Sequence, residues 1–295
     1  MKSHTLPARM LGMTLESIRE RIRPVMSREA AAKALGVSQQ TLWRVEKAQW
    51  DKPPKKTMIL ALCRLYKVGD AEERTVLDLL EGANESGWWQ KFGDAMAPGF
   101  SQFVARESTA RRMFSYQDPL LPGLLQTPAY RRALAFAIDP STDDETVAES
   151  VALAIRRQRR LAGASDERLE VNLVLAEGVL RQRIGGRHVM YEQLTRLVEV
   201  SELDTVSLRV VPEGTPHVGL VTGPFVLLES PRSAVEWVPD EPPTVYLQHF
   251  TGSLYLGRHE EVQRYYRAFE AIEEAALSLA ESRDLIACIA KETQP

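Results

Sequence analysis

The sequence predicts a multi-domain protein, with an all-α five-helix domain over residues 1–82 followed by an α/β (α+β) domain over residues 83–295. Apolar residues recur at helical spacing in the first part, whereas short strand-like stretches alternate with helical ones further along the chain. The charge divides in a similar way. Residues 1–70 contain 14 Lys and Arg against 6 Asp and Glu, and the other residues contain 23 against 34. A basic part and an acidic part indicate two different roles.

Five helices are expected in the first domain. Leu11 to Arg23 has apolar residues at helical spacing, and Pro24 ends this helix because proline cannot continue it. Ser27 can cap a second helix that runs to residue 35, and Ser38 can cap a third that runs to about residue 47. After a proline-containing loop, two more helices are predicted over residues 57–66 and 71–81.

The stretch "SREAAAKALGVSQQTLWRVEKA", residues 27–48, has the pattern of a helix-turn-helix. Small residues are needed where the second helix crosses the first, and Ala31 and Ala32 provide them. The turn needs a residue that tolerates a positive φ, and Gly36 stands there. Leu42 and Val45 would line the inner side of the second helix. A structural helical hairpin would share part of this pattern, but a DNA-binding motif accounts for all of it.

If Leu42 and Val45 face inward, the polar residues of the same helix face outward. A glutamine amide matches the N6 and N7 atoms of adenine, and arginine matches guanine or a phosphate. Trp43 would contact thymine methyls or sugars, or else pack on a neighbouring loop or a partner subunit. The flanking lysines would contact phosphates without reading sequence. The candidate DNA-binding residues are Arg28, Ser38, Gln39, Gln40, Thr41, Trp43, Arg44, Lys47, Lys52, Lys55 and Lys56. Glu46 would repel DNA, so we expect it to pair with Arg19 or Arg21 instead.

The second domain mixes helical and strand-like stretches. An aromatic segment over residues 87–104 is partly helical, and a proline-broken turn enters a helix within residues 119–137. Further helices are predicted over residues 143–161 and 189–200, and residues 260–285 are expected to form one or two helices. Strands are predicted over residues 170–175, 206–211, 224–228, 234–238 and 244–247.

No catalytic or metal-binding pattern is present in the sequence. The five histidines are scattered, and the two cysteines, Cys63 and Cys288, have neither a zinc spacing nor a nucleophile signature. We therefore expect no enzyme, no catalytic residue, no cofactor and no metal; an enzyme domain fused to a DNA-binding module is a remote alternative. Since no apolar run approaches 18 residues, we expect no membrane association, and a cytoplasmic, nucleoid-associated protein.

Two groups of motifs carry a resemblance to known proteins. The stretches "LGMTLESIRE" and "REAAAKALGVSQQTLWRVE" are similar to Xre-type (lambda-repressor-like) helix-turn-helix regulators. Five further motifs resemble the large C-terminal domain of unknown function in actinobacterial antitoxin-like regulators of the Scr type: "GWW", "PLLPGLLQTPAY", "EGVLRQRIGG", "GPFVLLE" and "VYLQHFTGSLYL".

The resemblance implies a lambda-repressor-like fold for the first domain, dimerisation, and a small partner protein encoded by an adjacent gene. We therefore expect a homodimeric transcriptional regulator that binds an inverted-repeat operator in double-stranded DNA. Residues 83–295 would form the regulatory and dimerisation domain. The alternative is a regulator that senses a small-molecule effector, for which the aromatic segment from Trp88 to Phe103 would be the first place to look.

Overall fold

The computed structural model describes residues 5–50, 52–84, 87–97, 99–162, 168–233 and 235–294. The chain forms two compact units. The first comprises Met1–Lys91, Ser101–Thr109 and Pro231–Glu241. The second comprises Phe92–Phe100, Ala110–Ser230 and Pro242–Pro295. Two short segments from later in the sequence thus belong to the unit that holds the N-terminal helices. The predicted boundary at residue 82 stays a prediction.

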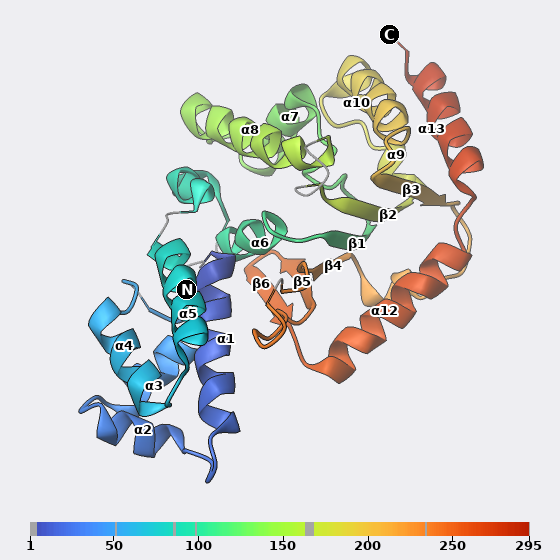
Figure 1. The fold of residues 1–295 in the computed structure, drawn as a ribbon. Coiled ribbons are helices and arrows are strands. Elements are labelled where there is room, and N and C mark those ends of the chain that lie inside the picture. The colour runs from blue at the N-terminus through green and yellow to red at the C-terminus, as the bar shows by residue number, and fades with distance from the viewer. Residues whose placement is uncertain are drawn as a thin grey trace. The chain divides into compact units, whose positions relative to one another are not determined.

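The first unit contains all five predicted helices (Figure 1). Their bounds are α1 Leu6–Arg21, α2 Arg28–Ala34, α3 Gln39–Glu46, α4 Lys56–Leu65 and α5 Asp70–Asn84. Helix α1 begins five residues before the predicted start at Leu11, because Pro7 fits the first turn of a helix, where its missing N–H is not needed. The 3₁₀-helical segment η1 (Trp88–Ala95) and helix α6 (Phe100–Glu107) follow.

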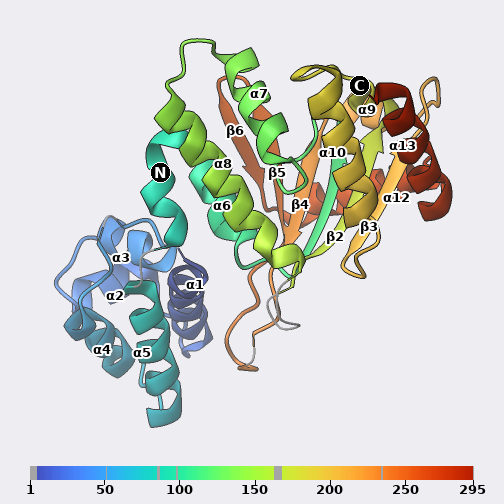
Figure 2. The same cartoon turned by 90° about the horizontal axis from the view of Figure 1, so that it is seen from above.

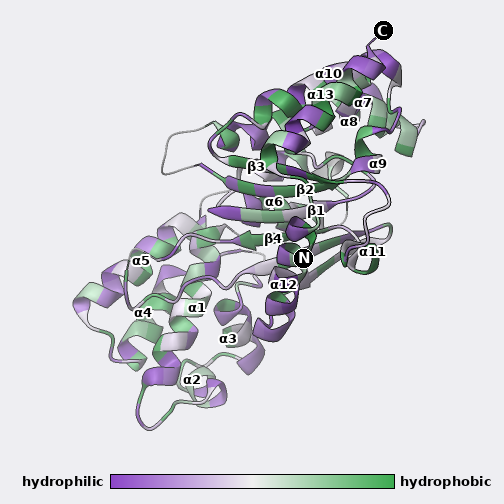
Figure 3. Cartoon of the chain, turned by 90° about the vertical axis from the view of Figure 1, so that its right-hand side faces the viewer, coloured by the Kyte–Doolittle hydropathy of each residue, from purple (hydrophilic) through white to green (hydrophobic). Residues whose placement is uncertain are grey.

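One apolar core holds the helices of the first unit together. Leu11, Leu15 and Ile18 of α1 are buried in it with residues of α2 to α5. Helices α1, α4 and α5 are amphipathic, and Figure 3 shows this as alternating green (hydrophobic) and purple (hydrophilic) bands along them. This core supports the helix-turn-helix from behind.

The second unit is built on a mixed six-stranded sheet with the strand order β3-β2-β1-β4-β5-β6. Strands β1, β2 and β3 run parallel, and β4, β5 and β6 pair antiparallel. The strands are β1 Arg112–Gln117, β2 Glu170–Ala176, β3 Val206–Val211, β4 Phe225–Glu229, β5 Thr244–His249 and β6 Gly252–Leu256.

Helices cover both faces of this sheet. The helical segments are α7 Pro128–Ile138, α8 Asp144–Gln158, η2 Arg159–Leu161, α9 Glu177–Leu180, α10 Gly186–Val200, α11 Gly219–Thr222, α12 His259–Glu274 and α13 Leu279–Thr293. Helices α7, α8 and α10 lie across one face, with α13 beside α10, and α12 lies across the other (Figures 1 and 2). Between α12 and the sheet, Phe225 and Leu227 of β4 and Phe269 of α12 are buried in one apolar core. A multi-domain layout of a helical domain and an α/β domain is thereby confirmed.

Three details of the predicted sheet were wrong. A strand was predicted over residues 234–238, but the described part, Val235 to Val238, is a turn closed by the bond from Val238 N to Val235 O; Ala234 lies outside the described residues. Strand β1 was missed because a buried serine, Ser115, interrupts its apolar pattern; its hydroxyl donates to Phe225 O at 3.3 Å. Strand β6 was also missed, since it is a short edge strand that begins with glycine.

Candidate nucleic-acid interface

Helices α2 and α3 meet at a tight turn centred on Gly36. This residue has φ +67°, a left-handed conformation that glycine adopts without steric cost. Ser27 and Ser38 cap the two helices, as their positions predict. The Ser27 hydroxyl accepts from Ala30 N at 3.1 Å, and the Ser38 hydroxyl accepts from Thr41 N at 3.0 Å. The sequence therefore specifies where each helix of the motif begins.

Packing then decides which face of α3 points outward. Ala31 and Ala32 of α2 are buried, as are Leu42 and Val45 of α3. These are the four residues that the pattern assigned to the inside of the motif. The opposite face of α3 is left to solvent.

A buried ion-pair cluster fixes α3 against α1 and α2. The Glu46 side chain is fully buried, and its Oε1 lies 2.6 Å from Arg19 Nε. Its Oε2 accepts from Arg28 Nε at 2.7 Å. Burial alone would lower the pKa of Arg19, but the hydrogen bond and charge of Glu46 outweigh it and raise that pKa. The predicted pairing with Arg19 is confirmed, whereas Arg21 pairs with Glu72 instead.

Two candidate DNA-binding residues have partners within the chain. Arg28 Nη2 donates to Glu16 Oε1 at 2.9 Å, and Lys47 Nζ donates to Glu16 Oε2 at 2.6 Å. Lys47 is exposed, while Arg28 is half-buried and also holds Glu46. Neighbouring carboxylates therefore offset part of both positive charges. Sequence spacing did not indicate this, because Glu16 lies on α1.

The outward face of α3 presents the predicted polar side chains. Gln39, Gln40 and Arg44 are exposed, and their side chains make no hydrogen bond or ion pair with any residue that the structure describes. Ser38 and Thr41 are exposed too, but their hydroxyls are 2.8 Å apart and hydrogen-bonded to each other. Amides and a guanidinium on an exposed helix can reach base edges in a major groove.

The remaining candidates lie around this face. Trp43 is half-buried, which leaves both of its predicted roles open. Lys52, Lys55 and Lys56 are exposed: Lys52 and Lys55 lie between α3 and α4, and Lys56 is the first residue of α4. Within the described ranges, none of the three lysines has an ion-pair partner. They can therefore offer their full charge to a phosphate.

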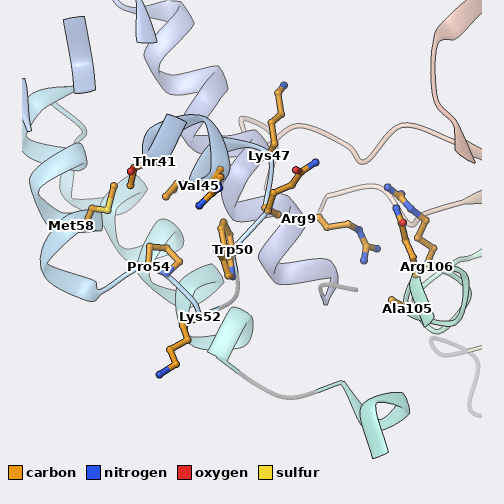
Figure 4. A pocket seen from close by; sticks show the side chains of 14 residues that line it. Arg9, Thr41, Val45, Lys47, Trp50, Lys52, Pro54, Met58, Ala105 and Arg106 are labelled. Atoms are coloured by element: carbon orange, nitrogen blue, oxygen red, sulfur yellow. The ribbon is translucent and has the colours of Figure 1, made fainter. Parts of the chain in front are cut away.

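A groove of about 710 Å³ runs along the flank of α3. Thr41, Arg44 and Val45 of α3 line it, with Met58 of α4 and with six residues between the two helices: Lys47, Ala48, Gln49, Trp50, Lys52 and Pro54. Arg9 of α1 and Arg106 of α6 line the side away from Thr41 and Met58 (Figure 4). Its cationic side chains are Arg9, Arg44, Lys47, Lys52 and Arg106, and the described residues of its lining include no acidic one.

A second buried carboxylate holds two of these arginines. Glu241 is 6% exposed. Arg9 binds it through Nε and, at 2.9 Å, through Nη2, and Arg106 Nη1 donates to it at 2.7 Å. Sequence reasoning missed this cluster, since its members are separated by up to 232 positions. No local pattern could have indicated it.

Family models match both parts of the chain. Residues 100–288 match the model of a domain of unknown function (DUF5753). The chain belongs to the DUF5753 family. Residues 10–77 match a helix-turn-helix domain, which supports a DNA-binding regulator. The DUF5753 match begins with α6 and extends into α13. No curated protein and no solved structure matches the chain.

Two further observations concern the chemistry of the described residues. They include no group of three or more His, Cys, Asp and Glu side chains that could hold a metal ion. No helix among them is long and apolar enough to cross a membrane.

Proposed function

We propose that the protein is a sequence-specific transcriptional regulator that reads double-stranded DNA with α3 in the major groove. The exposed face of Gln39, Gln40 and Arg44 carries this proposal, because these side chains are unsatisfied by the described residues and stand on a capped, rigidly held helix. Glutamine would read adenine and arginine would read guanine. Lys52, Lys55 and Lys56 would contact phosphates and set the register.

A mobility-shift assay against a genomic fragment library tests this function. At moderate salt and with competitor DNA, the protein should retain a small set of fragments. If no fragment is retained above the competitor background, the proposed function is wrong.

We further propose that the working unit is a homodimer on an inverted repeat. One helix contacts only a few base pairs, which is too little information to select a site in a genome. Two symmetric half-sites, about 34–36 Å or a multiple of it apart, would supply the rest. The second unit offers the larger surface for dimerisation. Light scattering that gives one chain both in the free state and on the best operator would refute the dimer.

The second unit, on this proposal, is regulatory and not catalytic, and its input is a small partner protein from an adjacent gene. The sequence has no catalytic constellation, and it resembles actinobacterial, Xre-type regulators of the antitoxin-like Scr type, which are often encoded beside a small partner. Binding to genomic DNA would place the protein on the nucleoid. A partner that binds the DNA-bound arrangement more tightly must raise the affinity for DNA. DNA then raises the affinity for the partner by the same factor. Operator titration with and without the neighbouring gene product measures that factor. An unchanged affinity at saturating partner would favour the small-molecule sensor.

A further inference from the structure

The groove lies beside the face of α3 that we propose to read bases. Thr41 and Arg44 line it, and they are neighbours of Gln40 on the same helix. Thr41, Arg44, Lys47, Gln49 and Lys52 are exposed, so this part of the groove is open to solvent. On the proposed function, the sugar-phosphate backbone of a duplex whose bases face Gln39 and Gln40 would run beside this face, where the groove lies.

The far side of the groove is formed by α6. Gln102, Ala105 and Arg106 of this helix line it. Residues Ser101–Thr109 belong to the first unit although the DUF5753 match begins at residue 100. The helix-turn-helix match ends at residue 77, so it does not include this surface.

Charge identifies the class of occupant. The five cations of the lining, with no acidic side chain among its described residues, favour a polyanion. The carboxylate of Glu241 holds Arg9 and Arg106 in fixed positions, so little side-chain entropy would be lost when an anion binds.

We propose that this groove binds the phosphodiester backbone of the same DNA whose bases α3 reads, with Gln102 and Arg106 of α6 as additional phosphate-positioning residues. The inference rests on the proposed function. It assigns the first helix of the DUF5753 region to the DNA-binding surface. A phosphate contact of this kind adds affinity for any sequence and steepens the salt dependence.

The test introduces a charge of either sign at Gln102, which makes no hydrogen bond or ion pair with the described residues and lies one helical turn before Arg106 on α6. The full-length chain is compared with Gln102→Lys and Gln102→Glu on its best operator and on a random duplex, by fluorescence anisotropy over a range of salt. The matched controls are Gln90→Lys and Gln90→Glu, since Gln90 is exposed in the first unit but does not line the groove. Thermal unfolding of each variant shows whether the fold is kept.

Gln102→Lys should tighten binding of both duplexes by about fivefold at about 100 mM salt and steepen the slope of log K against log salt by about 0.9. Gln102→Glu should do the opposite, while both Gln90 variants stay close to wild type. A structural role could not give effects of opposite sign. If both Gln102 variants bind both duplexes as wild type does, the inference is overturned while the proposed function stands.

A second arm separates DNA from a small phosphate compound. We expect calorimetric titration to detect no pyrophosphate binding in the groove. If the wild-type chain binds pyrophosphate and Gln102→Glu abolishes that binding without changing the affinity for DNA, the groove is a small-ligand site and the inference is overturned. A wild-type chain that binds no DNA in the first arm would refute the proposed function itself.

Discussion

Glu46 and Arg19 form a buried ion pair, with Oε1 of the glutamate 2.6 Å from Nε of the arginine and with side chains only 0% and 5% exposed. The pair joins the end of α3 to α1, and Arg28 extends it to α2. A buried pair adds little net stability compared with an apolar contact, but removing one partner leaves an uncompensated buried charge. Its main consequence is therefore the fixed direction of α3.

Replacing Glu46 should accordingly destabilise the first unit. We expect Glu46→Ala to lower the free energy of unfolding by about 3–5 kcal/mol, because the charges of Arg19 and Arg28 lose their buried counter-ion. Urea unfolding followed by tryptophan fluorescence measures this. The control is Glu20→Ala, whose carboxylate is 61% exposed and 3.3 Å from Arg19, and which should cost less than about 1 kcal/mol. Equal costs for the two variants would contradict the account.

Lys55 should contribute to affinity without contributing to specificity. Because it is exposed and has no ion-pair partner among the described residues, Lys55→Ala should weaken operator and random DNA by the same factor. The slope of log K against log salt should become shallower by about one unit. Arg74→Ala, an exposed cation on α5, is the control and should leave the slope unchanged. A loss confined to the operator would show that Lys55 reads sequence.

Tyr116 in the sheet predicts an alkaline loss of stability. Burial, with a smaller contribution from the charge of Asp118, raises the pKa of Tyr116 to about 12. An unfolded tyrosine ionises near pH 10, so the unfolded chain loses this proton first and the free energy of unfolding falls as pH rises from about 10 to 12. Tyr116→Phe should reduce that fall by about 2 kcal/mol.

The same variant should be tolerated at neutral pH. The Tyr116 hydroxyl is buried and has no hydrogen-bond partner among the described residues, so its removal loses no bond. Denaturant titrations at pH 7, 10 and about 12 provide both readings. If the free energy of unfolding falls with pH equally in the wild type and in Tyr116→Phe, the fall is due to other ionisable groups.

The helix-turn-helix could be predicted because its determinants are local. Ser27, Gly36 and Ser38 act within a few residues of themselves, and the apolar positions of α3 follow from helical spacing. The pairing of Glu46 with a residue of α1 could also be predicted, because an acidic residue beside a DNA-binding face needs a counter-ion.

Long-range contacts could not be predicted in this way. Nothing near Glu241 in the sequence indicates that it binds Arg9 and Arg106, or that these arginines line a groove with α3. Strand β1 was not predicted for a related reason. It lies between β2 and β4, and the hydroxyl of its buried Ser115 is hydrogen-bonded to a neighbouring strand. In each case the residue's role depends on a partner that is distant in the sequence.

The base-reading role of α3 is the central claim, and Gln39 tests it most directly. Wild-type protein and Gln39→Ala are each used to select binders from a random duplex library, and affinities for the winning site and for random DNA are then measured. The account predicts that Gln39→Ala loses about 1–3 kcal/mol on the wild-type site, keeps its affinity for random DNA, and selects sites with one position relaxed. Equal weakening on both DNAs, with an unchanged selected site, would contradict it.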